Sequence, residues 1–403
     1  MVKHLKIAFT DSVKPWISSI EDRTCIPINE TDFTNIGAVV VSASEMDVLD
    51  NEQIRSFGIP VIVMVVDPSH TISFDMERIG AVIDVTSTSI NDYKGTIEQI
   101  VASYEALILP PFFKALSDYV GDNNAQFDCP GHQGGQFFAK HPTGRAFYDF
   151  FGDHIFRADL CNADVKLGDL LIHEGYAHDA QAHAAAVYNA DKTYFVLNGT
   201  SSANKVVLNA LLTPGDIILY DRNNHKSICH GGLVMSGATP IYLETARNPF
   251  GSIGGILDHC FDESYIRNLI GEKDPNKAKA DRPIRLAVIQ LGTYDGTIYN
   301  ARQVVDKIGH LCDYIFFDSA WVGYEQFIPM MKDCSPLLLE LGPNDPGILV
   351  TQSVHKQQAG FSQTSQIHKK DKHIKGQDRY VDHKRFNNSF MMHASTSPFY
   401  PLF

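Results

Sequence analysis

The chain has 403 residues, of which 44% are hydrophobic and 20% charged, a composition typical of soluble globular proteins with two or three domains. The formal net charge is -13, and the first 110 residues carry 7 basic against 16 acidic side chains, which argues against nucleic-acid binding there. Seven scattered cysteines form no CxxC pair and no apolar run approaches the roughly 20 residues that span a bilayer, so we expect a cytoplasmic protein without a disulfide framework, a metal site or a membrane segment.

The first 107 residues alternate short apolar runs with polar segments. Four runs are predicted to be buried parallel strands, because their apolar character is continuous: "LKIAF", "GAVVVSA", "PVIVMVV" and "GAVIDV". With the amphipathic segment 91–108 as a closing helix, the pattern predicts a small flavodoxin-like α/β domain that resembles a response-regulator receiver in outline. Ser42 and Ala43 end the strand where a receiver carries its phosphorylated aspartate, so we expect a wing or assembly role instead.

The rest of the chain is predicted to be a second, larger domain. Two prolines in "LPPFFKALSDYV" mark a boundary, and residues 108–150 are predicted to be linking helices. Residues 151–403 are predicted to be an α/β domain whose strands are separated by helix-length stretches: "TYFVL", "DIILY", "RLAVIQL", "YIFFD" and "GILVT". One basic cluster, residues 368–375, is predicted to be a solvated loop.

A hydroxyl-rich segment follows the first strand of this larger domain. In "VLNGTSSAN", Thr200 and Ser201 stand at the predicted start of a helix, where free backbone N–H groups, hydroxyls and the helix dipole attract an anion such as phosphate. The spacing lacks the lysine of a Walker motif, so a nucleoside triphosphate is not implied. An ordinary N-cap turn would give the same pattern.

Three further residues follow predicted strand ends. Asp318 closes "YIFFD" at the edge where open α/β sheets bind ligands, although a helix cap would also place an aspartate there. His225 and Lys356 follow "IILYDRNN" and "GILVTQSVH", and solvated loop residues are the plain alternatives. In this order, the helix start, the aspartate and the lysine meet the needs of pyridoxal phosphate: an anion site, an acid beside the ring nitrogen and an amine for the aldehyde.

At these residues the chain resembles the bacterial inducible ornithine, lysine and arginine decarboxylases, which are pyridoxal-phosphate enzymes of the aspartate-aminotransferase fold. The resemblance covers essentially the whole chain and rests on motifs such as "QFDCPGHQGGQFF", "YNADKTYFVLNGTSSAN", "FDSAWVGYEQF" and "QSVHKQQAGFSQTSQIHKK". It implies that Lys356 binds the cofactor aldehyde, that Asp318 partners the ring nitrogen and that His225 stacks on the ring. It implies further roles for six residues: Thr200, Ser201 and Ser353 at the phosphate, Ala320 and Trp321 in the pocket wall, and His355 beside the reacting carbon.

The resemblance also implies a reaction. The expected activity is decarboxylation of a basic amino acid, with L-ornithine, which yields putrescine, favoured over lysine or arginine by whole-chain similarity. The family forms homodimers and often larger assemblies, and its reaction consumes a proton, which implies roles in acid resistance and polyamine synthesis. Family members continue for several hundred residues beyond the end of this sequence, so we expect a C-terminally truncated cofactor domain. Two alternatives stay open: another pyridoxal-phosphate enzyme such as an aminotransferase, and a non-catalytic fragment.

Overall fold

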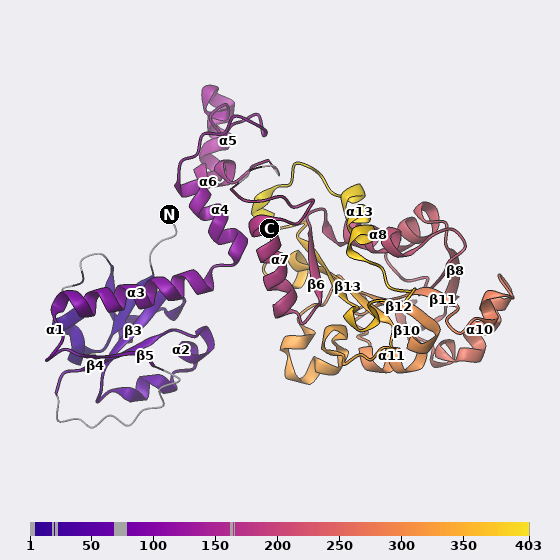
Figure 1. Ribbon diagram of the computed structural model, residues 1–403, viewed down its shortest axis with the longest axis horizontal. Helices are drawn as coiled ribbons and strands as arrows, with labels where there is room; N and C mark the ends of the chain where they lie inside the picture. The colour runs from indigo at the N-terminus through magenta and orange to yellow at the C-terminus, as the bar shows by residue number, and fades with distance from the viewer. Residues whose placement is uncertain are drawn as a thin grey trace. The chain divides into compact units, whose positions relative to one another are not determined.

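The computed structural model of the chain describes residues 5–17, 20, 23–67, 79–161, 164 and 166–402. The chain divides into two compact units, Met1–Gly121 and Asp122–Phe403 (Figure 1). The three-part division into 1–107, 108–150 and 151–403 stays a prediction.

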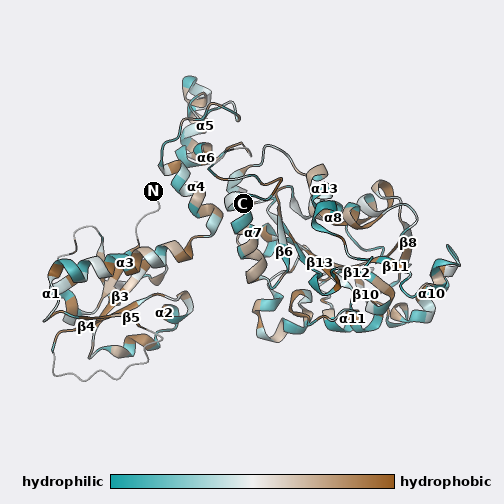
Figure 2. Ribbon diagram, in the orientation of Figure 1, coloured by the Kyte–Doolittle hydropathy of each residue, from teal (hydrophilic) through white to brown (hydrophobic). Residues whose placement is uncertain are grey.

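The first unit is the expected flavodoxin-like domain, and its parallel sheet has five strands, because the short β2 joins the four strands that were predicted. Its strands, in spatial order, are β2 (Cys25–Pro27), β1 (Lys6–Phe9), β3 (Ile36–Ser42), β4 (Val61–Val65) and β5 (Ile79–Asp84). Every residue of β3 and β4 is buried, as a strand covered on both faces requires, and Figure 2 shows these strands in the brown of hydrophobic residues. Its helices are α1 (Lys14–Ile17), α2 (Glu52–Phe57), α3 (Ile90–Ile108) and α4 (Pro111–Gly121).

Helix α3 closes this unit. Its N-cap is Ser89, whose hydroxyl accepts the backbone N–H of Asp92, and the helix buries Tyr93, Ile97 and Val101 in the core of the sheet. Among the residues that the structure describes, no single helix is long and apolar enough to cross a membrane, and α3 and α4, bent by 114°, pass that test only as a pair.

The second unit is built on a seven-stranded sheet in which only β14 runs antiparallel to its neighbours. The strands, in spatial order, are β6 (Lys192–Val196), β14 (Ser365–Lys370), β13 (Gly347–Ser353), β12 (Cys312–Ser319), β11 (Ile284–Gln290), β7 (Ile217–Asp221) and β8 (Thr239–Leu243). A separate two-stranded sheet pairs β9 (Thr245–Arg247) with β10 (Ile253–Ile256).

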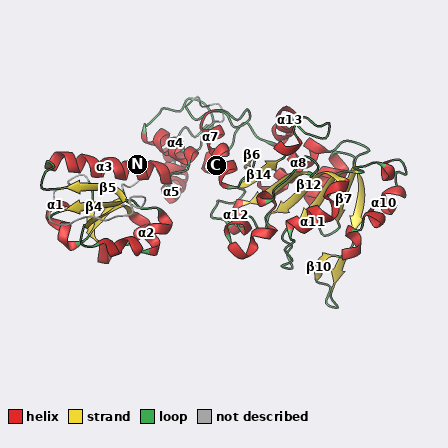
Figure 3. Ribbon diagram, turned by 60° about the horizontal axis from the view of Figure 1, so that its bottom comes forward, coloured by secondary structure: helices red, strands yellow, loops and turns green. Residues whose placement is uncertain are grey.

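Helices lie on both sides of the seven strands, so the second unit has three layers (Figure 3). One apolar core is shared with α8 (Gly199–Leu211) and α13 (His383–His393), and the other with α10 (Glu263–Gly271) and α11 (Ala301–Ile308). The remaining helices are α5 (Pro142–Phe151), α6 (Asp153–Arg157), α7 (Gly175–Val187), α9 (Lys226–Cys229) and α12 (Val354–Gln357). This is the α/β architecture that the sequence predicted for the larger domain.

Strand β14 corrects one prediction. Residues 368–375 form a solvated loop only in part: residues 368–370 belong to β14, which lies inside the sheet between β6 and β13, whereas Lys372 and Lys375 are exposed. His368 and Lys369 are buried, and Lys369 Nζ lies 2.5 Å from Asp371 Oδ2 and donates to the Val381 carbonyl at 2.7 Å. The prediction was wrong for residues 368–371, because ion pairing and hydrogen bonding allow charged side chains to be buried there.

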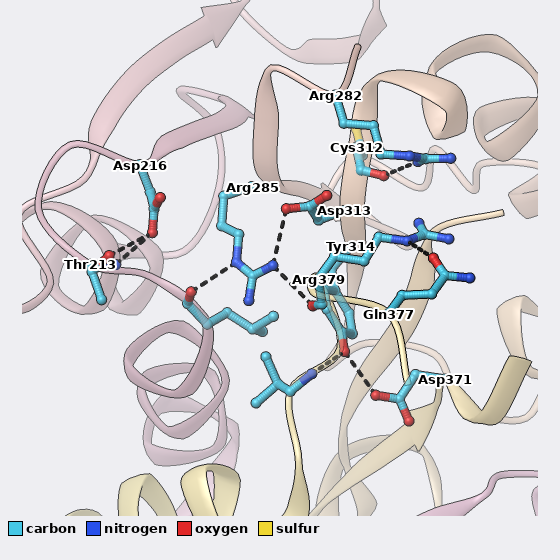
Figure 4. A network of polar contacts seen from close by, with 12 residues as sticks. Thr213, Asp216, Arg282, Arg285, Cys312, Asp313, Tyr314, Asp371, Gln377 and Arg379 are labelled. Carbon is cyan, nitrogen blue, oxygen red and sulfur yellow. Dashed lines mark hydrogen bonds and ion pairs between the residues drawn. The ribbon is translucent and has the colours of Figure 1, made fainter. Parts of the chain in front are cut away.

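A polar network holds the edge of the sheet where β11 and β12 begin (Figure 4). Arg285 donates to Asp313 Oδ2 at 3.0 Å and to the Leu211 carbonyl at 3.2 Å, so it joins the end of α8 to both strands. Nearby, the Tyr314 hydroxyl donates to Asp371 Oδ2 at 2.9 Å. These contacts join the end of α8 to the starts of β11 and β12. They therefore help to fix the start of α8 and the carboxyl ends of the two strands relative to one another.

Candidate active site

A cavity of about 300 Å³ lies at the carboxyl ends of β12 and β13 and at the start of α8. It brings together all nine residues that the sequence singled out: Thr200, Ser201, His225, Asp318, Ala320, Trp321, Ser353, His355 and Lys356. They meet because parallel strands place their carboxyl ends at one edge of the sheet, where α8 also begins. Seven lining residues were not predicted: Gly199, Asn204, Asn223, Gln290, Tyr294, Ser362 and Gln363.

One end of the cavity is formed by hydroxyl groups. Gly199 opens α8 with φ of +71°, a conformation that side chains rarely allow, and its N–H donates to the Gln363 carbonyl at 2.8 Å. Behind it, Thr200 Oγ1 and Ser353 Oγ are both buried and lie 2.6 Å apart. The first-turn N–H groups of α8 have no partner within the helix, so this end can receive an anion.

The other end holds a buried carboxylate. Asp318 is 2% exposed, and its two oxygens accept hydrogen bonds from Asn204 Nδ2 at 2.8 Å and from the Ala320 N–H at 3.1 Å. Burial raises the pKa of Asp318, while the Asn204 and Ala320 donors and the nearby His225 and Lys356 act in the opposite direction. A cationic ligand atom at this position would stabilise the ionised carboxylate further.

Lys356 lies on α12, the short helix that follows β13. Its Nζ is 4.3 Å from the centroid of the Trp321 ring, and Trp321 in turn contacts Tyr294 edge to face at 4.8 Å. Burial lowers the pKa of Lys356, and the charge of Asp318 partly opposes that shift. A lower pKa increases the fraction of neutral amine, the form that attacks a carbonyl carbon.

Two histidines are fixed by single partners at the walls of the cavity. His355 Nδ1 donates to the Thr364 carbonyl at 2.8 Å, which leaves Nε2 as the ring nitrogen able to exchange a proton. His225 caps α9, and its Nδ1 lies 2.8 Å from Ser227 Oγ and accepts the Ser227 N–H at 3.3 Å. Burial lowers the pKa of His225, so its ring is a neutral flat surface at neutral pH.

The donor set fits pyridoxal phosphate. Buried hydroxyls and a helix start suit the phosphate, and the buried carboxylate of Asp318 has unfavourable desolvation that a protonated ring nitrogen would offset. Lys356, with its lowered pKa, lines the same cavity and suits the aldehyde.

Two of the lining residues that the sequence did not predict carry signals in it. Asn204 stands four residues after Thr200, hence on the same face of α8, and an asparagine is a poor choice for a buried helix interior unless it has partners. Gln290 is the polar end of the apolar run "RLAVIQ" and pairs in register with Asp318. Both could be found by following helix and strand registers from the predicted site residues.

A buried histidine lies on β14, beside β13. His368 on β14 is fully buried, with Nε2 3.1 Å from Gln352 Oε1 and Nδ1 2.8 Å from Thr193 Oγ1. Since an amide oxygen only accepts, Nε2 carries the proton and Nδ1 accepts the Thr193 hydroxyl. Burial lowers the pKa of His368 from 6.5 to about 3.

The lowered pKa of His368 predicts that the folded chain loses stability at acidic pH. The unfolded chain protonates this histidine near its ordinary pKa, and the folded chain does so only near the lowered one, so stability is lost as the pH falls from 6.5 towards 3. Between neutral pH and about pH 5, protonation of His368 in the unfolded chain is expected to lower the free energy of unfolding of the wild type by about 2 kcal/mol. His368→Gln lacks this contribution, so its free energy of unfolding should fall by about 2 kcal/mol less over the same range. Urea unfolding at several pH values measures the slope. The exposed His178→Gln is the matched control, and equal slopes for both variants would contradict the prediction.

Comparison with known proteins agrees with this geometry. A family model described as "Orn/Lys/Arg decarboxylase, major domain" matches residues 110–403. The chain is 66% identical over 401 residues to an ornithine decarboxylase of Haemophilus influenzae and 64% identical over 401 residues to an inducible ornithine decarboxylase of Escherichia coli K12. Matched lysine and arginine decarboxylases are more distant, at 36% to 40% identity.

The same comparisons give the share of each relative that this chain covers. Each of the two ornithine decarboxylases is matched over 99% of this chain but over only 55% and 54% of its own length, so the chain spans about half the length of the curated relatives it matches. The crystal structure of a lysine decarboxylase of Francisella novicida superposes with a TM-score of 0.83 at 31% identity, over 99% of this chain and 57% of that one.

Proposed function

The chain belongs to the Orn/Lys/Arg decarboxylase family, and on that premise we propose that it carries out pyridoxal-phosphate-dependent decarboxylation of L-ornithine to putrescine and carbon dioxide. The substrate is proposed from relatives named as ornithine decarboxylases at 59% to 66% identity. Lysine or arginine as the substrate and a fragment without activity are the alternatives. We further propose a cytoplasmic homodimer or a larger assembly of such dimers.

One observation carries the proposal: a lysine with a lowered pKa, a buried carboxylate and paired buried hydroxyls share one cavity. Thr200, Ser201 and Ser353 would hold the phosphate, Asp318 the ring nitrogen and Lys356 the aldehyde. Pyridoxal phosphate, when bound, supplies an electron sink for the pair released as the substrate carboxylate leaves.

The chain's own residues then orient the substrate and move protons. His225 presents its neutral ring as a flat surface, and Ala320 and Trp321 line one wall of the cavity. Asp318 keeps a proton on the ring nitrogen because its buried carboxylate is stabilised by a cation. Either Lys356 Nζ or His355 Nε2 returns a proton to the substrate's α-carbon, and His355 Nε2 must first take up that proton because Nδ1 holds the ring proton for the Thr364 carbonyl.

The test begins with the purified 403-residue chain and pyridoxal phosphate. A visible absorption band, followed by borohydride reduction and peptide mass mapping, is expected to find the cofactor mass on Lys356. Carbon dioxide release from ornithine, lysine and arginine then ranks the substrates. No label on Lys356 would reject the proposal, and a label without release from any of the three amino acids would favour the fragment.

The hydroxyl pair predicts phosphate selectivity. The double variant Thr200→Val with Ser353→Ala is expected to bind pyridoxal phosphate about tenfold to a hundredfold more weakly, because two donors to a charged group are lost. Pyridoxal, which lacks the phosphate, should bind as it does to the wild type. Titrations of both ligands measure the difference, with Ser202→Ala on the same helix as the control. Equal weakening for both ligands would mean that the pair serves folding instead.

A further inference from the structure

Asn204 is a buried amide that lines the cavity and contacts Asp318. It lies on α8 with 1% of its surface exposed. Its Nδ2 donates to Asp318 Oδ2 at 2.8 Å and to Ser227 Oγ at 2.9 Å, and its Oδ1 accepts the Thr351 hydroxyl at 2.8 Å. Both amide hydrogens and the amide oxygen are therefore engaged.

The first bond acts on Asp318. A carboxyl group that is buried favours its neutral form, and burial is the largest influence on the pKa of Asp318. An ionised carboxylate only accepts hydrogen bonds, and Asn204 offers it a donor. Because Thr351 occupies the amide oxygen, the amide is held with its hydrogens towards Asp318 and does not turn to accept a proton from it.

The second bond acts on His225. Ser227 Oγ accepts from Asn204, so the serine's own proton is free to go to His225 Nδ1 at 2.8 Å. The same Nδ1 accepts the Ser227 N–H. His225 is therefore held in the tautomer that carries its proton on Nε2, with its ring plane fixed by two donors.

We propose that Asn204 is a positioning residue that orients Asp318 and His225 together and keeps Asp318 ionised for the ring nitrogen of the cofactor. This inference rests on the proposed function, because it assumes that pyridoxal phosphate occupies the cavity. The competing explanation is that Asn204 only stabilises the fold. Asn209 shows that a hydrogen-bonded asparagine on this helix can have such a role: it makes three hydrogen bonds away from the cavity, to the Gly231 carbonyl, Ser236 and His393.

A cofactor analogue separates the two roles. In 1-deazapyridoxal phosphate a C–H group replaces the ring nitrogen, so the ligand keeps its phosphate and aldehyde but cannot use an ionised Asp318. Asn204→Ala is expected to bind pyridoxal phosphate about tenfold to a hundredfold more weakly than the wild type, the loss for a hydrogen bond to a charged group. Its affinity for the deaza analogue should match that of the wild type.

Asn209→Ala is the matched control, because it removes a bonded asparagine from the same helix and should change neither affinity. If Asn204→Ala does not fold, Thr351→Val carries the test, since it keeps the side-chain shape and releases only the amide oxygen. It should show a smaller loss with the same preference between ligands.

The outcomes distinguish this inference from the proposed function. Equal loss for both ligands, or no loss, overturns the positioning role while the Lys356 label in the wild type leaves the cofactor assignment standing. If the wild type takes up no pyridoxal phosphate on Lys356, both fail.

Discussion

Lys356→Ala is expected to abolish the borohydride-dependent cofactor label and to lower the rate of ornithine decarboxylation by about 10³-fold or more. The amine is the only proposed covalent contact with the cofactor aldehyde, and alanine offers neither a nucleophile nor a proton. Burial lowers the pKa of Lys356, which increases the share of neutral amine that this role needs. Peptide mass mapping after reduction and release of labelled carbon dioxide measure the two effects.

The control for this variant is Lys384→Ala, which removes an exposed lysine from α13 outside the cavity and should leave label and rate unchanged. A label that persists in Lys356→Ala at another lysine would contradict the assignment. So would a variant that keeps most of the wild-type rate. Thermal unfolding of both variants without cofactor shows whether a lost label reflects lost folding.

Continuous apolar runs predicted the central strands, because a strand that is buried on both faces has apolar side chains at successive positions. Strands β3, β12 and β13 are buried almost throughout, and each stood out in the sequence. The same criterion missed strands whose burial depends on ion pairs and hydrogen bonds, or whose position at the sheet edge admits a proline. Strand β14 carries charges that are compensated by Asp371 and backbone carbonyls, and the edge strand β8 contains Pro240. Neither compensation nor edge position is visible in local composition.

The candidate site was predictable to the extent that its residues mark local boundaries. Thr200 lies in the first turn of a helix, and Asp318 and Ser353 lie next to or at the ends of strands, so the fold class alone places them at one edge. The helix register places Asn204 on the same face as Thr200, but its role was not predictable because its partners Asp318 and Ser227 lie 114 and 23 residues away in the chain. Its importance depends on hydrogen bonds that only the folded structure brings together.

Asp318→Asn is expected to separate cofactor attachment from catalysis. The label on Lys356 should still form, because that step needs the lysine and the aldehyde alone. The rate should fall by about 10²-fold or more, since a neutral amide does not keep the ring nitrogen protonated as electrons flow towards it. Lys356→Ala loses the label, so the two variants distinguish the two roles.

The affinity for pyridoxal phosphate should also fall in Asp318→Asn. Burial raises the pKa of Asp318, so in the free chain its charge is poorly solvated, and a protonated ring nitrogen relieves that cost in the wild type only. A loss of about a hundredfold in affinity corresponds to about 2.7 kcal/mol less stabilisation at saturating cofactor. Thermal unfolding with and without cofactor measures it, with the exposed Asp333→Asn as the control. An unchanged cofactor-induced stabilisation in Asp318→Asn would show that the buried carboxylate does not meet the ring nitrogen, and the orientation proposed for the cofactor would have to be reversed.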